Sequence, residues 1–277
     1  MKVNSLVLFG DLHAGCQLAL IPPRGIQQTH GPKVTPSPFQ KKLWRMWREF
    51  WDEWVPQATR GDEFAVVNLG DTLDGRHHNA TSQWSHDLAD QANCAARLLE
   101  PIVELCGGRY YHLRGTEAHG GPQGEQEEML ADRLGAVPAE GLSARFELWK
   151  YVGASADILV HCLHHIGTTG AAAYETTAVH KEFIDAVTEA GRWGHRPPDV
   201  IVRAHRHRYI KTEVATENER GVSMVLPGWQ GKTPFLYRIA GARLSQPQFG
   251  GAMIRLSEEG EPYIRQRVWS LQRPRPE

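Results

Sequence analysis

The sequence predicts an α/β fold, and three observations lead to that prediction. Short apolar runs typical of buried strands recur along the first 200 residues, segments with helical spacing lie between the earlier runs, and the runs end in polar residues. Ligands of open α/β sheets bind outside the carboxyl ends of the strands. The same pattern therefore predicts the fold class and the place of a site.

Five apolar runs are predicted as strands that end beside chemically reactive side chains. The runs, each with the residues that follow it, are 5–9 (Gly10-Asp11), 64–69 (Gly70-Asp71), 110–113 (Arg114-Gly115), 158–163 (His164-His165) and 200–202 (Ala204-His205). We expect the ends of these strands to meet in one crevice.

Two longer segments have the spacing of amphipathic helices. Residues 39–54 place four tryptophans on one helical face, which indicates packing into the core rather than a platform for stacking bases. Residues 83–105 carry apolar side chains on one side and are followed by Gly107-Gly108, a typical helix end. Residues 125–134 and 173–190 are shorter helical candidates.

The second half of the chain predicts a second sheet that is more antiparallel than the first. Residues 146–152 and 157–163 resemble a hairpin, and the further strand candidates are 209–214, 223–226, 252–256 and 263–269. The stretches 21–38 and 241–251 are rich in proline or glycine and predict irregular structure. We expect one domain over residues 1–272 and a flexible tail over residues 273–277.

Composition limits the class of protein. The 277 residues include 31 Lys+Arg and 32 Asp+Glu, so no overall basic charge indicates nucleic-acid binding, and 41% hydrophobic residues is typical of a globular chain. The four cysteines lack the spacing of a zinc ribbon, and no apolar run has the length of a signal-peptide core or a membrane span. We expect a cytoplasmic protein with no membrane partner; the sequence does not indicate its oligomeric state.

Carboxylates and imidazoles dominate the predicted strand ends. The motifs are Asp11-x-His13, Gly70-Asp71-x-x-Asp74, Gly115-Thr116-Glu117-x-His119, His164-His165 and His205-x-His207. This mixture suits Mn²⁺, Fe²⁺ or Zn²⁺. The number of candidate ligands exceeds the four that one tetrahedral zinc ion takes, so we expect two divalent ions. The expected metal is Mn²⁺, with Fe, Zn or Mg as alternatives. Asp71, directly after a strand and a glycine, is the expected bridge between the two ions.

In this order the motifs resemble those of the calcineurin-like metallophosphoesterases: Asp-x-His, Gly-Asp-x-x-Asp, Gly-Asn-His-Asp/Glu, a lone His and Gly-His-x-His. The resemblance spans Leu6 to His207. Its third motif is similar to that of metallophosphoesterase-like proteins predicted in phages and prophages. The resemblance implies a four-layer α/β/β/α sandwich of two mixed sheets, with a dinuclear site at the carboxyl ends of the strands. It also implies a first ion on Asp11, His13 and His207, a second on His164 and His205, and Asp71 between them.

The third motif departs from the family pattern, because Thr116 stands where the family has its Asn ligand. We expect Glu117 to replace that ligand on the second ion, with Asn79 or His78 as alternatives. His119 is expected to supply the imidazole that faces the substrate.

The remaining expectations concern which of two adjacent histidines binds metal and which residues surround the ions without binding them. His165 is an alternative to His164, because adjacent strand residues point to opposite faces. Asp74 is expected to orient His13 or His119 through a hydrogen bond rather than to bind metal. The substrate-binding candidates are His78, Arg114 and Arg206, Gln230 could touch substrate, and His112 and His161 are expected to be structural or surface residues.

The resemblance implies a hydrolase that cleaves phosphate esters with water activated by two metal ions. His119 is the expected catalytic residue, which stabilises the developing charge and protonates the leaving oxygen, with Asp74 beside it. A phosphodiesterase or nuclease acting on nucleic acid is preferred. The alternatives are a phosphomonoesterase acting on nucleotides or phosphoproteins, and a non-catalytic metal-binding module.

Overall fold

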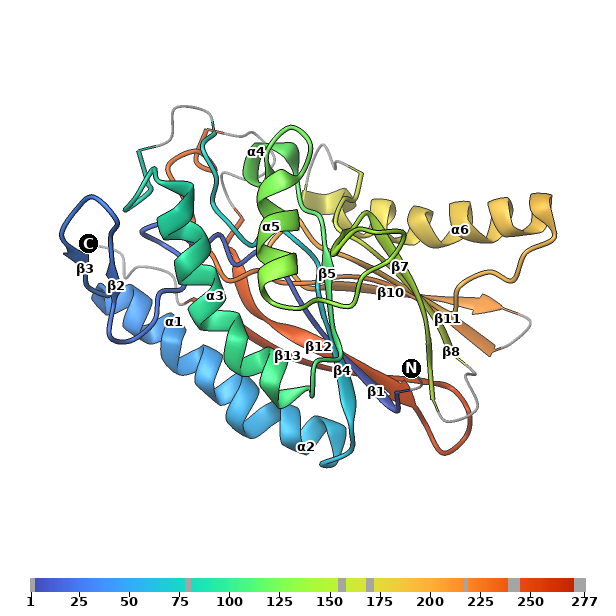
Figure 1. The fold of residues 1–277 in the computed structure, drawn as a ribbon. Helices are drawn as coiled ribbons and strands as arrows, with labels where there is room; N and C mark the ends of the chain where they lie inside the picture. Colours follow the sequence, from blue (N-terminus) through green and yellow to red (C-terminus); the bar gives the residue numbers. More distant parts are fainter. Residues whose placement is uncertain are drawn as a thin grey trace.

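The computed structural model describes residues 3–77, 81–153, 158–167, 172–216, 219–238 and 245–271. Most of the strands form two mixed sheets. Helices α1, α3 and α5 lie on one side of the strands and α6 lies on the other (Figure 1). The predicted mixed α/β fold class is confirmed.

The larger sheet has six strands in the order β13-β12-β1-β4-β5-β6. The four strands β1, β4, β5 and β6 run parallel to one another, whereas β12 runs antiparallel to both β1 and β13. The strands are β1 (Ser5–Phe9), β4 (Phe64–Asn68), β5 (Tyr110–Leu113), β6 (Ala144–Arg145), β12 (Gln248–Leu256) and β13 (Pro262–Ser270).

The smaller sheet has five strands in the order β10-β11-β9-β8-β7. Its inner strands are parallel, and both edge strands are antiparallel to their neighbours. The strands are β7 (Glu147–Val152), β8 (Ile158–Leu163), β9 (Val200–Arg203), β10 (Ile210–Thr216) and β11 (Glu219–Val225). A two-stranded ribbon of β2 (Ile26–Gln27) and β3 (Lys33–Val34) lies within the stretch predicted to be irregular.

The five strand ends that were expected to meet come from both sheets, because the strands at 158–163 and 200–203 belong to the smaller one. The assignment of strands to sheets differs from the prediction in one respect. The last two strands, β12 and β13, join the larger sheet beside β1 instead of the second one. Hydrophobic patterning identifies a strand but does not identify its partner, because any buried strand offers the same backbone donors and acceptors.

Two of the longer helices, α1 and α3, begin at side-chain caps. Ser37 caps α1 and forms a capping box with Gln40, and Pro38 occupies the first turn. Asp87 caps α3, which therefore starts later than predicted. The helices are α1 (Pro38–Arg48), the π-helix η1 (Glu49–Trp54), α2 (Val55–Thr59), α3 (Leu88–Leu105), α4 (Glu117–Gly120), α5 (Glu125–Arg133), the 3-10 helix η2 (Ala172–Tyr174) and α6 (Glu175–Trp193).

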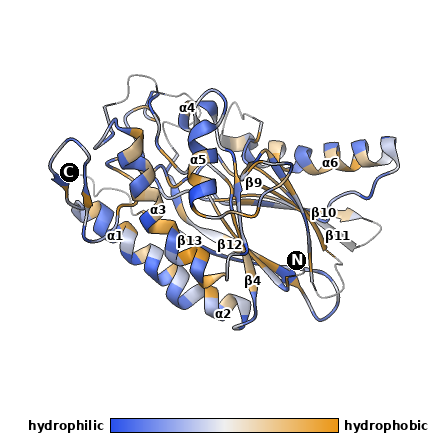
Figure 2. Cartoon of the chain, viewed as in Figure 1, coloured by the Kyte–Doolittle hydropathy of each residue, from blue (hydrophilic) through white to orange (hydrophobic). Residues whose placement is uncertain are grey.

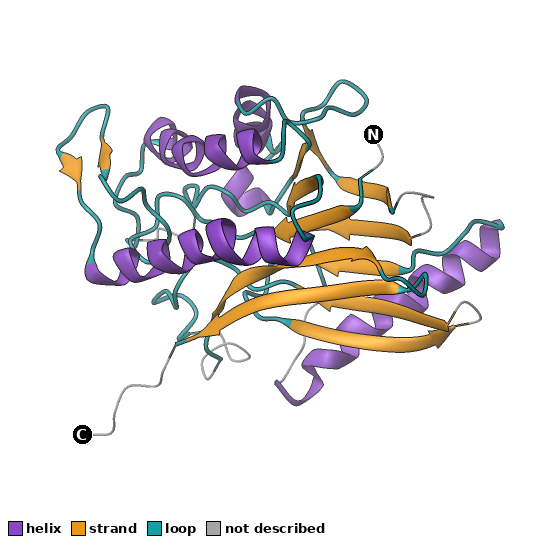
Figure 3. Ribbon diagram, turned by 90° about the horizontal axis from the view of Figure 1, so that it is seen from below, coloured by secondary structure: helices purple, strands orange, loops and turns teal. Residues whose placement is uncertain are grey.

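Alternation along β1 supplies two separate cores. Val7 and Phe9 pack against helices on one face of the larger sheet, and Leu6 and Leu8 face the smaller sheet. The strands are therefore largely hydrophobic in Figure 2 and lie between helices in Figure 3. On the outer face of the smaller sheet, Phe183 of α6 lies where a side chain on Gly221 would clash with it.

The tryptophan face packs into the core between the helices and the larger sheet, called the first core below, as predicted. Trp47 and Trp51 are each 2% exposed, and both rings meet Phe9 edge-on at 5.6 Å between centroids. This packing fixes the strand that leads directly into Asp11. None of the described helices is long and apolar enough to span a bilayer.

Candidate metal centre

The turns after β1 and β4 are held against each other by backbone hydrogen bonds. The amide of Asp11 donates to the Gly70 carbonyl at 2.9 Å, and the amide of His13 donates to the Asp71 carbonyl at 3.0 Å. Asp11, His13 and Asp71 have φ values of 54°, 46° and 48°, in the left-handed region that costs a non-glycine residue roughly 1–2 kcal/mol. Backbone strain of this kind gathers at functional sites.

One group of possible metal ligands comes from the β1 turn and the loop after β9. Ligand atoms of Asp11, His13 and His207 all lie within 4.8 Å of one another. Nε2 of His207 lies 3.4 Å from Oδ1 of Asp11 and 3.1 Å from Nε2 of His13. These are the three residues that the family resemblance implied for the first ion.

A second group combines Asp71 with His164 and His205, within the same limit of 4.8 Å. Nε2 of His164 lies 3.1 Å from Oδ2 of Asp71, and its Nδ1 donates to the Leu69 carbonyl at 2.6 Å. The hydrogen bond to Leu69 leaves Nε2 of His164 as the atom that faces Asp71. The neighbouring His165 is exposed and belongs to none of the groups found among the described residues.

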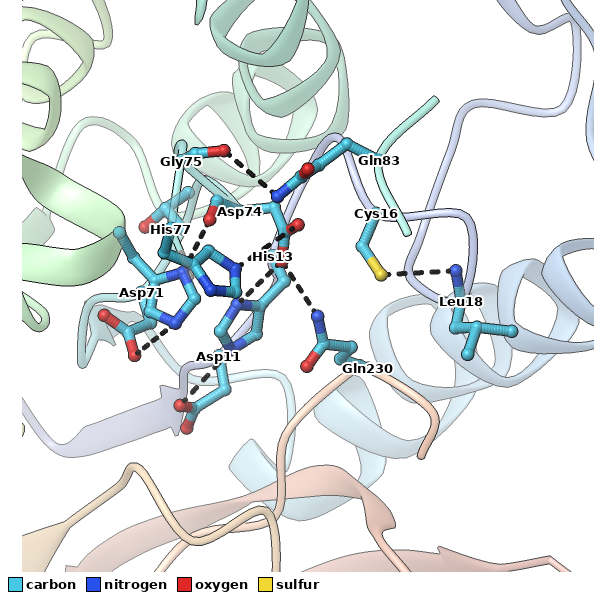
Figure 4. Close-up of polar contacts among 12 residues, drawn as sticks. Asp11, His13, Cys16, Leu18, Asp71, Asp74, Gly75, His77, Gln83 and Gln230 are labelled. Carbon is cyan, nitrogen blue, oxygen red and sulfur yellow. Dashed lines mark hydrogen bonds and ion pairs between the residues drawn. The ribbon is translucent and has the colours of Figure 1, made fainter. Parts of the chain in front are cut away.

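Asp74 forms a third group with His13 and His119, whose ligand atoms also lie within 4.8 Å of one another, and it contacts several site residues (Figure 4). Its Oδ1 is 3.4 Å from Nδ1 of His13 and accepts a 2.9 Å hydrogen bond from Gln230, and its Oδ2 is 3.7 Å from Nε2 of His77. The backbone carbonyl of Asp74 accepts a hydrogen bond from Nδ1 of His119 at 2.6 Å. Asp74 thus contacts both histidines that it was expected to orient.

Burial and neighbouring charge compete over the pKa values of the site. Burial acts to raise the pKa of Asp71, but the charges of His164 and His119 outweigh it and hold that pKa well below its usual range. Burial acts to lower the pKa of His164, whereas the Asp71 carboxylate raises it to about 9. The pKa of His119 falls to about 4 because burial and the charge of His13 both lower it.

The donor set fits divalent cations. Asp11, Asp71 and Asp74 are each no more than 1% exposed, and three buried carboxylates require nearby positive charge. Oδ1 of Asp11 and Nε2 of His164 are buried atoms that make no hydrogen bond to any described residue. Such atoms, surrounded by imidazole and carboxylate groups, match the ligand preferences of Mn²⁺, Fe²⁺ and Zn²⁺.

Members of both groups open onto one cavity of about 270 Å³. Asp71, His205 and His207 line it, as does His119, whose Nε2 lies 3.9 Å from Oδ2 of Asp71. The remaining lining is mixed, with Arg206 and Arg208 beside the apolar side chains Phe235, Leu236 and Pro247.

The altered third motif does not have the expected geometry. Glu117 is exposed and lies in none of the three ligand groups found among the described residues. Instead, Thr116 holds Asp71: its amide donates to Oδ1 at 2.6 Å and its hydroxyl donates to the same oxygen at 3.1 Å. The sequence indicated no role for Thr116 and this contact was missed, although its position directly after Gly115 placed it at the correct strand end.

The predicted substrate-binding residues have different surroundings. Arg114 donates to the carbonyls of Ala144 and Gln123 and lies over the Phe146 ring, so its guanidinium is held by β6 and the loop before α5. Arg206 lines the cavity, but its guanidinium donates to the carbonyls of Glu175 and Gly167. His78 and Asn79 lie outside the described residues.

Comparison with known families and curated proteins finds no match. Among solved structures, the chain is similar to a predicted phosphoesterase from Streptococcus pneumoniae TIGR4, at 9% identity and a TM-score of 0.34, with 98% of this chain and 99% of that chain covered. It is also similar to Vps29 of Chaetomium thermophilum, at 12% identity and a TM-score of 0.36 over 99% and 100% of the two chains. A third similar structure is the sulfate thiohydrolase SoxB of Thermus thermophilus in complex with glycerol, at 13% identity and a TM-score of 0.39; the match covers 98% of this chain and 57% of SoxB.

Proposed function

We propose that the chain is a metal-dependent phosphoesterase of the calcineurin-like type. The observation that carries the proposal is that two groups of ligand atoms, each with one carboxylate and two imidazoles, contribute to the lining of one cavity. The succession of a helix layer, two packed sheets and α6 supports the four-layer sandwich implied by the motifs.

In this proposal Asp11, His13 and His207 would hold one divalent ion, His164 and His205 would hold the second, and Asp71 would serve both. Bound Mn²⁺, the metal that we propose, would supply Lewis-acid chemistry that lowers the pKa of water and attracts the phosphoryl oxygens. The pKa values of His164 and His207 are raised in the ion-free protein by Asp71 and Asp11 respectively, against the effect of burial. Both imidazoles must lose a proton to become ligands, so metal affinity should increase with pH.

His119 is the catalytic residue in this proposal. A carbonyl can only accept, so the hydrogen bond from Nδ1 to the Asp74 backbone fixes the proton on Nδ1 and leaves Nε2 facing the cavity. With a pKa of about 4, Nε2 carries no proton at neutral pH. His119 would therefore accept the proton that the attacking water loses and then give that proton to the leaving oxygen, which revises the expectation that it starts as an acid.

The cavity wall supports a phosphodiester substrate. Phe235, Leu236 and Pro247 offer an apolar surface to an organic ester group, and Arg206 supplies positive charge nearby. A phosphodiester carries one organic group on each side of phosphorus, so it uses such a wall better than a monoester does. We propose a nucleic acid as the candidate substrate, and the cytoplasm as the compartment.

Hydrolysis of bis-p-nitrophenyl phosphate with added Mn²⁺ tests the proposal, with p-nitrophenyl phosphate, single-stranded DNA and duplex DNA as parallel substrates. We expect turnover that a chelator abolishes and that His164→Ala reduces by at least about 100-fold, because one ligand of the second ion is lost. His180→Ala, which removes an exposed histidine of α6, is the matched control and should keep full activity. Mn²⁺ binding without turnover of any substrate would favour the metal-binding module instead.

A further inference from the structure

A buried polar network lies directly beneath the Asp71 turn. Glu127 of α5 and His112 of β5 are both 0% exposed, and Nε2 of His112 donates to Oε2 of Glu127. The phenol of Tyr110 lies 2.9 Å from Nδ1 of His112, and Asn68 donates to that phenol at 3.1 Å. These four side chains form one connected set that none of the proposed catalytic steps uses.

The network ends on the backbone on both sides of Asp71. Oε1 of Glu127 accepts a 2.8 Å hydrogen bond from the amide of Thr72, the residue after Asp71. Oδ1 of Asn68 accepts from the amide of Gly70, the residue before it, and Nδ2 of Asn68 donates to the Thr72 hydroxyl at 2.8 Å. The network therefore fixes the peptide units next to the carboxylate that both ions would share.

The β1 turn holds the same segment from the opposite side. The carbonyls of Gly70, Asp71 and Thr72 accept hydrogen bonds from three backbone amides of the β1 turn. With these carbonyls held by β1 and the flanking amides held by the network, the left-handed conformation of Asp71 is fixed from both directions. A residue with positive φ stays in that conformation only when its surroundings determine it.

We propose that Glu127 and His112 are positioning residues for the metal centre. They act through the Thr72 amide to keep Asp71 in its left-handed conformation, so that its carboxylate faces the ligand histidines. Neither residue touches a ligand atom or the substrate. The metal-centred role rests on the proposed function, whereas the hold on the Thr72 amide can be measured without any metal.

The buried carboxylate is costly, which argues for a role beyond packing. Removing a carboxylate from water is expensive, and well-packed apolar side chains of similar volume are often as stabilising as a buried ion pair. Asp90 provides the comparison: it is 2% exposed and accepts hydrogen bonds from the amide and hydroxyl of Thr29 and from Ser85. Asp90 joins a loop to α3, and its hydrogen bonds among the described residues go to Thr29 and Ser85 rather than to the Asp71 turn, so it is the matched control.

The first measurement is Mn²⁺ affinity by titration calorimetry on the full chain. Loss of a group that supports a metal ligand typically costs 10–100-fold in affinity, so Glu127→Leu should weaken Mn²⁺ binding by at least about tenfold. The Mn²⁺ affinity of Asp90→Leu should stay within about threefold of the wild-type affinity, even if this variant loses as much stability as Glu127→Leu. Glu127→Gln keeps an acceptor oxygen for Thr72 and should recover most of the affinity. Equal weakening in the two leucine variants would overturn the proposal.

The second measurement is hydrogen exchange of the Thr72 amide in the metal-free protein. Exchange should accelerate at least about tenfold in Glu127→Leu and remain unchanged in Asp90→Leu; unchanged exchange in Glu127→Leu overturns the proposal. If Glu127→Leu does not fold, His112→Phe gives the same test, because it fills the space while leaving Oε2 of Glu127 without its donor. A wild-type chain that neither binds Mn²⁺ nor hydrolyses phosphate esters refutes the proposed function, and the exchange result still decides whether Glu127 holds the turn.

Discussion

Gly115→Ala should disable the metal centre while leaving the fold in place. Gly115 follows β5 and lies against the Asp71 turn. A Cβ atom built on Gly115 would lie 2.8 Å from Cα of Asp71, and still closer to the Asp71 amide nitrogen and Oδ1. Carbon atoms in contact prefer about 3.5–4.0 Å, so the two turns must separate by roughly 1 Å.

The size of the effect follows from that displacement. Overpacking a well-packed region typically costs about 1–3 kcal/mol of stability, which is a fraction of the roughly 5–15 kcal/mol that holds a domain folded. A shift of about 1 Å in a catalytic group costs roughly 100-fold in rate. Since Asp71 is the proposed shared ligand, Mn²⁺ affinity should fall together with the rate.

Turnover of bis-p-nitrophenyl phosphate, Mn²⁺ calorimetry and urea unfolding together measure these effects. Gly191→Ala in α6 is the control, because a Cβ there meets no atom within 4 Å, and it should raise stability by roughly 0.5–1 kcal/mol without changing the rate. If Gly115→Ala keeps its rate within threefold of the wild type and its Mn²⁺ affinity is unchanged, the site does not depend on the close approach of the Gly115 and Asp71 turns.

Two further predictions concern stability. Trp51→Ala should cost about 3–5 kcal/mol in urea unfolding because Trp51 is 2% exposed in the first core; a stable variant that had lost only nucleic-acid affinity would contradict the packing role. His161 has its pKa lowered to about 4 by burial and by Arg203, so its contribution to stability is full above its ordinary pKa of 6.5 and is lost as the pH falls toward 4. When the pH is lowered from 7.5 to 4.5, the free energy of unfolding measured in urea should therefore fall by about 2 to 3 kcal/mol more in the wild type than in His161→Gln. Equal losses in the two proteins would show that His161 does not titrate in this way.

The sequence predicted those site residues that directly follow strands. Asp11, Asp71, His164 and His205 each come just after a buried apolar run, so their convergence followed from strand order alone. The bridging role of Asp71 stays a prediction, since the structure places it with the second group only.

Other site features depend on contacts that a local pattern does not reveal. Glu117 begins the short helix α4 and faces outward, whereas the amide of Thr116 points to Asp71; the direction of such a turn is set by its packing. Arg114 is held by the Ala144 carbonyl of β6 and by the Gln123 carbonyl of the loop before α5. Glu127 is one of several glutamates in α5, so the sequence did not distinguish it as buried. His112 is a histidine within an apolar strand, and it was the one residue whose position indicated a buried polar network beneath Asp71.

Mn²⁺ stoichiometry tests the central claim most directly. Equilibrium dialysis followed by elemental analysis should find two Mn²⁺ ions per wild-type chain and fewer in Asp71→Asn, because an amide cannot share a negative charge between two cations. A wild-type chain that binds no Mn²⁺, or an Asp71→Asn chain that keeps two ions and the wild-type rate, would contradict the account.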